Sequence, residues 1–208
     1  MKKVMGVIVA ALLSVGFMGV PAQATLVTLA LPDNCPSCFG SDYTLIISQD
    51  VNSSMVTAKL IIDTTQYTGK GSYISAVDFK VANDFTNLSL TKAPGDTSSW
   101  VTSSNGINSS GCDSNGKGFV CSQDPAVVLA APVGVGKVYE WDWQFTLPAG
   151  VTLNLADVHI GAKYNNAQGT LNGQITSESV PVPEPATLLL LGSGLVGLGA
   201  FAWRRRKS

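Results

Sequence analysis

Apolar and polar residues alternate along several segments of the chain, with a period of two residues. The clearest segment is 138–147, in which every second side chain is large and apolar: Tyr139, Trp141, Trp143, Phe145 and Leu147. Because successive side chains of a β-strand point to opposite faces, this pattern predicts a strand with one buried and one solvated face. Weaker alternation or short apolar runs predict further strands at 43–49, 56–63, 77–81, 86–91, 127–131, 158–164 and 169–178.

Turn signals rich in Gly, Pro and Asn separate these segments, and the body of the chain has no convincing helical period. Seven or eight short strands of this kind predict an all-β fold, an antiparallel β-sandwich or jelly roll. We expect one domain over residues 25–180, which is long enough to bury a core without a metal or a partner chain.

The N-terminal segment 1–24 has the layout of a secretory signal peptide. Two lysines precede an apolar stretch over 4–20, and Ala22-Gln23-Ala24 has small residues at the two positions that signal peptidase reads. An uncleaved N-terminal anchor is the alternative. The short apolar run and Pro21 favour cleavage after Ala24.

A second apolar segment lies close to the C-terminus, over residues 186–203, and carries no charge. At a rise of about 1.5 Å per residue, this length just crosses a bilayer core. Arg204, Arg205, Arg206 and Lys207 follow at once, which predicts a single transmembrane helix with these cations on the cytoplasmic side. A buried core helix is the alternative, although a run of contiguous cations is unusual directly after such a helix.

Directly before this segment stands Val182-Pro183-Glu184-Pro185-Ala186-Thr187. The order of a Pro-Glu-Pro motif, an apolar span and an arginine cluster resembles the PEP-CTERM sorting signal of Gram-negative bacteria. The resemblance implies that Pro183, Glu184 and Pro185 form the recognition motif within a signal over 181–208, and that Arg204, Arg205 and Arg206 retain the chain in the membrane. It gives these residues the role of a substrate, with no catalytic part.

The same resemblance implies the partner and the route of the protein. An exosortase, a membrane-embedded processing enzyme, would release the body near the motif, and such systems accompany exopolysaccharide production. The precursor would lie in the inner membrane with its N-terminal domain in the periplasm. The mature form would be at the cell surface or outside the cell. Segments such as 74–80 and 162–164 also resemble uncharacterised extracellular domains that precede this tail.

Composition narrows the classes of function. The chain is 45% hydrophobic and 13% charged, which excludes a coiled coil and a highly charged disordered chain. The net charge of −1 excludes a strongly basic nucleic-acid binder. All three arginines lie in the tail, and residues 25–183 hold seven lysines against eleven aspartates and two glutamates, so the body carries a net charge of −6.

The four cysteines of an exported chain are expected to form disulfides. We favour Cys112 with Cys121 and Cys35 with Cys38 among the three possible pairings. A redox dithiol at 35–38 would need the N-terminus of a helix, which the pattern does not predict. A four-cysteine zinc site would need a closer spacing of the second pair.

Residues 93–118 are rich in Gly, Ser and Asn and predict a long loop. Within it, Trp100 is a candidate for stacking on a sugar ring, or else a plug for the open end of a sandwich. Asp113, Asn115 and Asp124 partly match a calcium-binding loop, but the glutamate and the flanking helices of that motif are absent. We expect no metal and no cofactor.

Candidate catalytic groups are few. His159 is the sole histidine, and no nucleophile-elbow pattern accompanies it. Glu140 and Asp142 share one face of their strand, as a glycosidase pair would, although alternating carboxylates are ordinarily a solvated face. We therefore expect a non-enzymatic protein of the cell surface or the exopolysaccharide matrix. A carbohydrate-binding module or glycoside hydrolase is the alternative.

Overall fold

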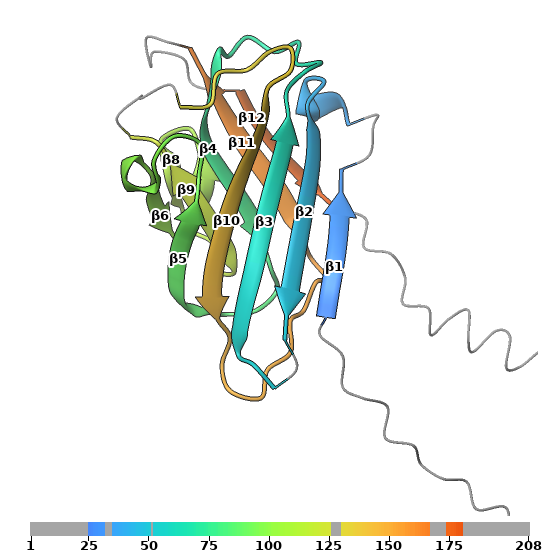
Figure 1. Cartoon of the computed structure of the whole chain (residues 1–208), viewed down its shortest axis with the longest axis vertical. Coiled ribbons are helices and arrows are strands. Elements are labelled where there is room, and N and C mark those ends of the chain that lie inside the picture. Colours follow the sequence, from blue (N-terminus) through green and yellow to red (C-terminus); the bar gives the residue numbers. More distant parts are fainter. Residues whose placement is uncertain (1–24, 32–34, 51, 126–129, 167–173, 181–208) are drawn as a thin grey trace, which may run out of the picture.

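The computed structural model describes residues 25–31, 35–50, 52–125, 130–166 and 174–180. Two five-stranded antiparallel sheets pack against each other around one core (Figure 1). The predicted all-β antiparallel fold is confirmed, whereas the finer jelly-roll topology stays a prediction. The signal peptide, the transmembrane segment 186–203 and the Pro-Glu-Pro motif fall outside the described residues. No helix within the described ranges is long and apolar enough to cross a membrane.

The first sheet, sheet A, has the strand order β1-β2-β3-β10-β5. Its strands, in that order, are Thr25–Ala30, Asp42–Gln49, Met55–Asp63, Val138–Thr146 and Thr86–Lys92. The second, sheet B, has the order β12-β11-β4-β9-β6. Its strands are Gln174–Ser179, His159–Asn165, Tyr73–Lys80, Phe119–Gln123 and Val101–Ser103.

Four smaller elements complete the described part of the body. Strands β7 (Gly106–Asn108) and β8 (Gly111–Ser114) form a separate two-stranded hairpin. The helical turns are short 3₁₀ segments, η1 (Pro36–Cys38) and η2 (Thr97–Ser99).

In the strand predicted at 138–147, the large apolar side chains lie in or against the core, as the alternation predicts. Trp141, Trp143 and Phe145 are almost fully buried between the sheets, while Gln144 between them is exposed. The Trp143 ring meets Phe79 of sheet B edge to face at 5.3 Å between centroids. Large apolar rings bury a large area each, so strand β10 contributes strongly to the core.

The structure differs from the sequence prediction in the segments that do not alternate. The described residues contain twelve strands instead of seven or eight. The long loop predicted over 93–118 is wrong, because this segment holds η2, β6, β7 and β8. Strand β4 begins at Tyr73 and not at Val77, since residues 73–79 are all buried and show no polar phase. In the segment 127–131, residues 127–129 are not described and Ala131 lies outside the strands.

Candidate functional site

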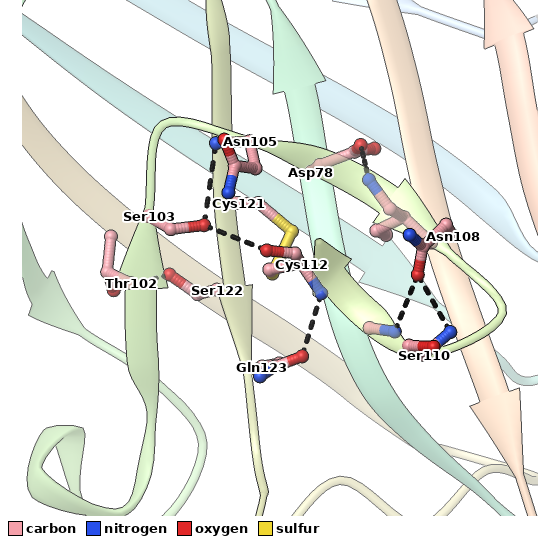
Figure 2. Close-up of a disulfide and its surroundings, with 12 residues drawn as sticks. Asp78, Thr102, Ser103, Asn105, Asn108, Ser110, Cys112, Cys121, Ser122 and Gln123 are labelled. Carbon is pink, nitrogen blue, oxygen red and sulfur yellow. Dashed lines mark hydrogen bonds between the residues drawn. A yellow bond between two sulfur atoms is a disulfide. The ribbon is translucent and has the colours of Figure 1, made fainter. Parts of the chain in front are cut away.

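The hairpin β7–β8 lies on the outer face of sheet B and is tied to it by a disulfide. Cys112 of β8 is bridged to Cys121 of β9, with a Cα–Cα distance of 5.7 Å, and both pack against Ala76 (Figure 2). The backbone N–H of Cys112 also donates to the side-chain oxygen of Gln123 at 2.7 Å. The predicted cysteine pairing is confirmed at this bridge and at Cys35–Cys38.

A buried carboxylate of sheet B binds the backbone of the hairpin β7–β8. Asp78 of β4 is 4% exposed, and its Oδ2 accepts a hydrogen bond from the backbone N–H of Ile107 at 2.8 Å. Burial raises the pKa of this carboxyl group from 3.8 to about 6. Gly161 of β11 lies opposite, and a Cβ there would stand 2.3 Å from Asp78 Oδ1. Glycine therefore leaves the room that the carboxyl group occupies.

A lysine completes this attachment. Lys163 of β11 is 6% exposed, and its Nζ donates to the backbone carbonyl of Ser109 at 2.6 Å. Burial lowers the pKa of this amine. Two ionisable side chains thus bind the backbone of one hairpin, which covers the outer face of sheet B and screens both groups from solvent.

A second buried polar cluster joins the two sheets. The hydroxyl groups of Tyr43 and Tyr164 contact each other. Tyr43 also donates to Thr176 at 3.4 Å, and Tyr164 donates to Ser41 at 3.0 Å. Burial raises the pKa of Tyr43 to about 12 and that of Tyr164 well above 10, so both phenols stay protonated at neutral pH. This arrangement fastens β2 to β11 and β12.

Trp100 lies in the core and not on the surface. Its indole is 6% exposed, its ring meets Trp141 edge to face at 5.5 Å, and its Nε1 donates to the carbonyl of Pro94 at 3.1 Å. No open ring face is left for a sugar, so the ligand-stacking role considered for Trp100 is corrected to that of a plug. The polar atom of the ring is satisfied inside the protein, as a buried tryptophan requires.

The segments weighed as alternative redox and metal sites have different surroundings from those that such chemistry needs. Cys35 and Cys38 are bridged around the 3₁₀ turn η1, which packs against β12. The carbonyl of Ser37 in that turn accepts a hydrogen bond from Thr176 at 2.9 Å. Of the partial calcium pattern, Asp113 is exposed and Asp124 is buried. Across the described ranges, no three His, Cys, Asp or Glu side chains gather as a metal site.

The two carboxylates Glu140 and Asp142 lie on the outer face of sheet A, among lysines. One oxygen of Glu140 contacts Lys59 Nζ at 2.6 Å and Lys92 Nζ at 2.8 Å. These contacts hold the pKa of Glu140 below its ordinary value. Burial and the neighbouring Glu140 charge raise the pKa of Asp142. Asp142 also lines a hollow of about 290 Å³, with Lys59 and Gln144.

Strand register brings together three residues that the sequence did not connect. Asp157 Oδ1 lies 3.0 Å from Nε2 of His159, and Ser179 Oγ lies 3.4 Å from its Nδ1 and 3.5 Å from its Nε2. A triad needs the serine aligned with one nitrogen, whereas this oxygen is almost equidistant from both. Asp157 is half exposed and also pairs with Lys80. The group is an exposed polar cluster at one end of sheet B.

The last strand carries the body directly to the predicted tail. Val180 follows β12, is 5% exposed and belongs to the core cluster. Its backbone N–H donates to the carbonyl of Val158 at 2.9 Å. The folded body therefore extends to Val180, and the tail begins at the next residue.

Residues 181–207 match the PEP-CTERM protein-sorting motif. The chain carries a PEP-CTERM sorting motif. The resemblance drawn from Pro183, Glu184, Pro185 and the arginine cluster is thereby confirmed. No curated protein matches the chain significantly.

A PEP-CTERM motif implies sorting through an exosortase to the cell surface, and hence export and a membrane-anchored precursor. The match begins where the described body ends, so it assigns the route of the protein and does not say what the body itself does. Cleavage after Ala24 and a helix over 186–203 lie outside the described residues and stay predictions.

Proposed function

We propose that the mature body of this PEP-CTERM protein is a non-enzymatic structural or adhesive component of the cell surface or of an exopolysaccharide matrix. The observation that carries the proposal is the position of the sorting motif, which begins one residue after a buried valine of the core. An exosortase that cuts near Pro183-Glu184-Pro185 releases the whole sandwich and leaves its core intact.

The construction of the body supports an extracellular role. Two disulfides fix segments outside the main sheets, the turn η1 and the hairpin β7–β8. Crosslinks of this kind persist in an oxidising compartment and restrict the unfolded chain. We place the precursor in the inner membrane with the body in the periplasm, and the mature form outside the cell.

Fractionation of cells that contain the processing enzyme, followed by intact mass of the protein, tests this proposal. We expect a species that starts at Thr25 and ends between Val182 and Glu184, in the surface or extracellular fraction. A full-length species confined to the cytoplasm would contradict the route. Rapid turnover of a matrix polysaccharide by the purified body would contradict the non-enzymatic role.

One observation favours a second candidate, a carbohydrate-binding module or glycoside hydrolase. The pKa of Asp142 is raised and that of Glu140 is lowered, and a pair whose environments separate its pKa values can divide the work of acid and base. The hollow beside Asp142 could receive part of a sugar. Turnover assays on matrix polysaccharides with Glu140→Gln separate the candidates, with Asp42→Asn on the same sheet as the matched control. Products that only Glu140→Gln abolishes would establish the hydrolase.

A further inference from the structure

Both ends of the body lie at one end of the sandwich. Thr25 pairs with Gln49 at the last position of β2, and Ser179 at the end of β12 pairs with His159 at the start of β11. Strands β1 and β12 are the edge strands on the same side of the two sheets (Figure 1).

A single loop, 147–158, joins these two points. The side chain of Gln49 donates to the carbonyl of Val151 at 3.3 Å and accepts from the N–H of Leu153 at 2.9 Å. At its other end the loop binds Val180 through Val158. The described body therefore starts and stops beside the same loop, at the end from which the chain continues into the sorting motif.

The length of the tail restricts how far this end can be from the processing machinery. Pro183 comes three residues after Val180, and a fully extended chain spans at most about 3.3–3.6 Å per residue, hence roughly 10 Å. The apolar segment begins six residues after Val180, or at most roughly 20 Å away. Withdrawing more chain from the body would remove Val180 from the core. Any enzyme that holds the motif therefore stands next to this end of the sandwich.

The surface beside the exit of the tail is polar and partly cationic. We call Lys80, Asn83, Asp84, Lys117 and Asp157 the exit surface; these residues line one hollow of about 260 Å³. Lys80 lies across from His159 in the strand register and contacts Asp157, which directly precedes the loop residue that binds Val180. Lys117 is exposed, and within the described part of the chain no carboxylate lies in salt-bridge contact with it. The exit surface thus offers a cation on a body whose net charge is −6.

We propose that the exit surface contacts the membrane-embedded processing enzyme while Pro183-Glu184-Pro185 occupies its recognition site, with Lys117 against an acidic segment of the enzyme. This inference rests on the proposed sorting route. The motif alone is short and linear, and a second contact at a fixed distance adds specificity, since linked contacts reinforce each other when the linker matches their separation.

Pulse-chase measurement of the conversion of precursor to mature protein tests the contact, in cells that contain the processing enzyme. We expect Lys117→Glu to slow conversion by about two- to fivefold, as for a charge at the rim of an interface, and Lys117→Gln to slow it less. Lys137→Glu is the matched control, because Lys137 is exposed and precedes β10 at the opposite end of the sandwich. We expect this variant to be processed at the wild-type rate.

A second experiment inserts about six flexible Gly and Ser residues after Val180. The insert uncouples the exit surface from the motif, because the distance between them is no longer fixed. We expect the insert to slow conversion, and Lys117→Glu to have no further effect in its presence. Wild-type rates for Lys117→Glu, or equal slowing by Lys137→Glu, would overturn the contact. Slowing by Lys117→Glu that persists with the insert would also overturn it and would indicate an effect of the membrane surface. A wild-type chain that is never processed would refute the sorting route itself, a distinct result.

Discussion

The carboxylate of Asp78 accepts a hydrogen bond from the backbone N–H of Ile107, 2.8 Å away, and so ties strand β4 to a hairpin that lies 29 residues further along the chain. The same hairpin is held by Lys163 and by the Cys112–Cys121 bridge. Burial makes the charged form of Asp78 unfavourable, which is why its pKa rises to about 6. The attachment of the hairpin is therefore coupled to a proton.

This coupling predicts a pH dependence of stability. Between pH 4 and 6 the folded protein keeps a proton on Asp78, whereas the unfolded chain, with the ordinary pKa of 3.8, has lost it. The contribution of Asp78 to the free energy of unfolding therefore falls as the pH rises through this window, by up to roughly 3 kcal/mol. We expect Asp78→Asn, which keeps an acceptor for Ile107, to lose this contribution and to be more stable relative to the wild type at pH 7 than at pH 4.

Urea unfolding of both proteins across this pH range measures the difference. Comparison with the wild type is necessary because Asp96, Glu140 and Asp157 have lowered pKa values and act in the opposite direction. Asp84→Asn, at an exposed carboxylate, is the matched control and should leave the profile unchanged. A constant difference between Asp78→Asn and the wild type at all pH values would refute the coupling.

The two disulfides should contribute unequally to stability. The Cys112–Cys121 bridge spans a sequence separation of 9, and Cys35–Cys38 a separation of 3. In the chain-entropy model, a longer closed loop removes more freedom from the unfolded chain. We expect replacement of both Cys112 and Cys121 by serine to lower the free energy of unfolding by roughly 2–3 kcal/mol. Replacement of both Cys35 and Cys38 by serine should lower it by roughly 2 kcal/mol or less. Non-reducing peptide mapping checks the pairing, and free thiols at Cys112 and Cys121 in exported protein would disprove it.

Trp100 should matter for stability and not for binding. Removal of its buried ring leaves a cavity beside Trp141, so Trp100→Ala should lower the free energy of unfolding by about 3–5 kcal/mol. Val135→Ala is the control, because Val135 is 86% exposed and its truncation should change stability by less than about 0.5 kcal/mol. A Trp100→Ala protein of unchanged stability that no longer binds glycans would contradict the buried position.

The sequence predicts the strands that have one solvent-exposed face, because only in these strands do apolar and polar residues alternate. Strand β10 is found almost to the residue for this reason. Strand β4 is not, since the hairpin covers its outer face and buries Ala76 and Asp78 almost as deeply as the core residue Val77 between them. Strands β6 to β8 have little apolar pattern of their own. Tertiary contacts hold them, such as the hydrogen bond from Ser103 to the carbonyl of Cys112.

The candidate sites differ in the same way. Some can be recognised from residues that are neighbours in the sequence, whereas others depend on contacts between distant segments. The sorting motif is linear, so its residues can be recognised without a fold. The cluster of Asp157, His159 and Ser179 depends on the register between β11 and β12, which the sequence does not contain. Whether Trp100 is buried or exposed likewise depends on which surface the segment 93–118 covers.

The last prediction concerns the tail. If Pro183-Glu184-Pro185 is the recognition motif, Glu184→Ala should leave an uncut precursor in the membrane fraction, because the carboxylate that the enzyme would read is gone. Glu178→Ala is a matched control that removes a carboxylate from β12, six residues earlier and inside the folded body. Deletion of Arg204, Arg205 and Arg206 should instead weaken retention in the membrane before processing, since cations beside an apolar span hold its end on the cytoplasmic side. Intact mass and fractionation distinguish these outcomes, and a mature wild-type protein that still carries residues 186–203 would show that the segment is a permanent anchor.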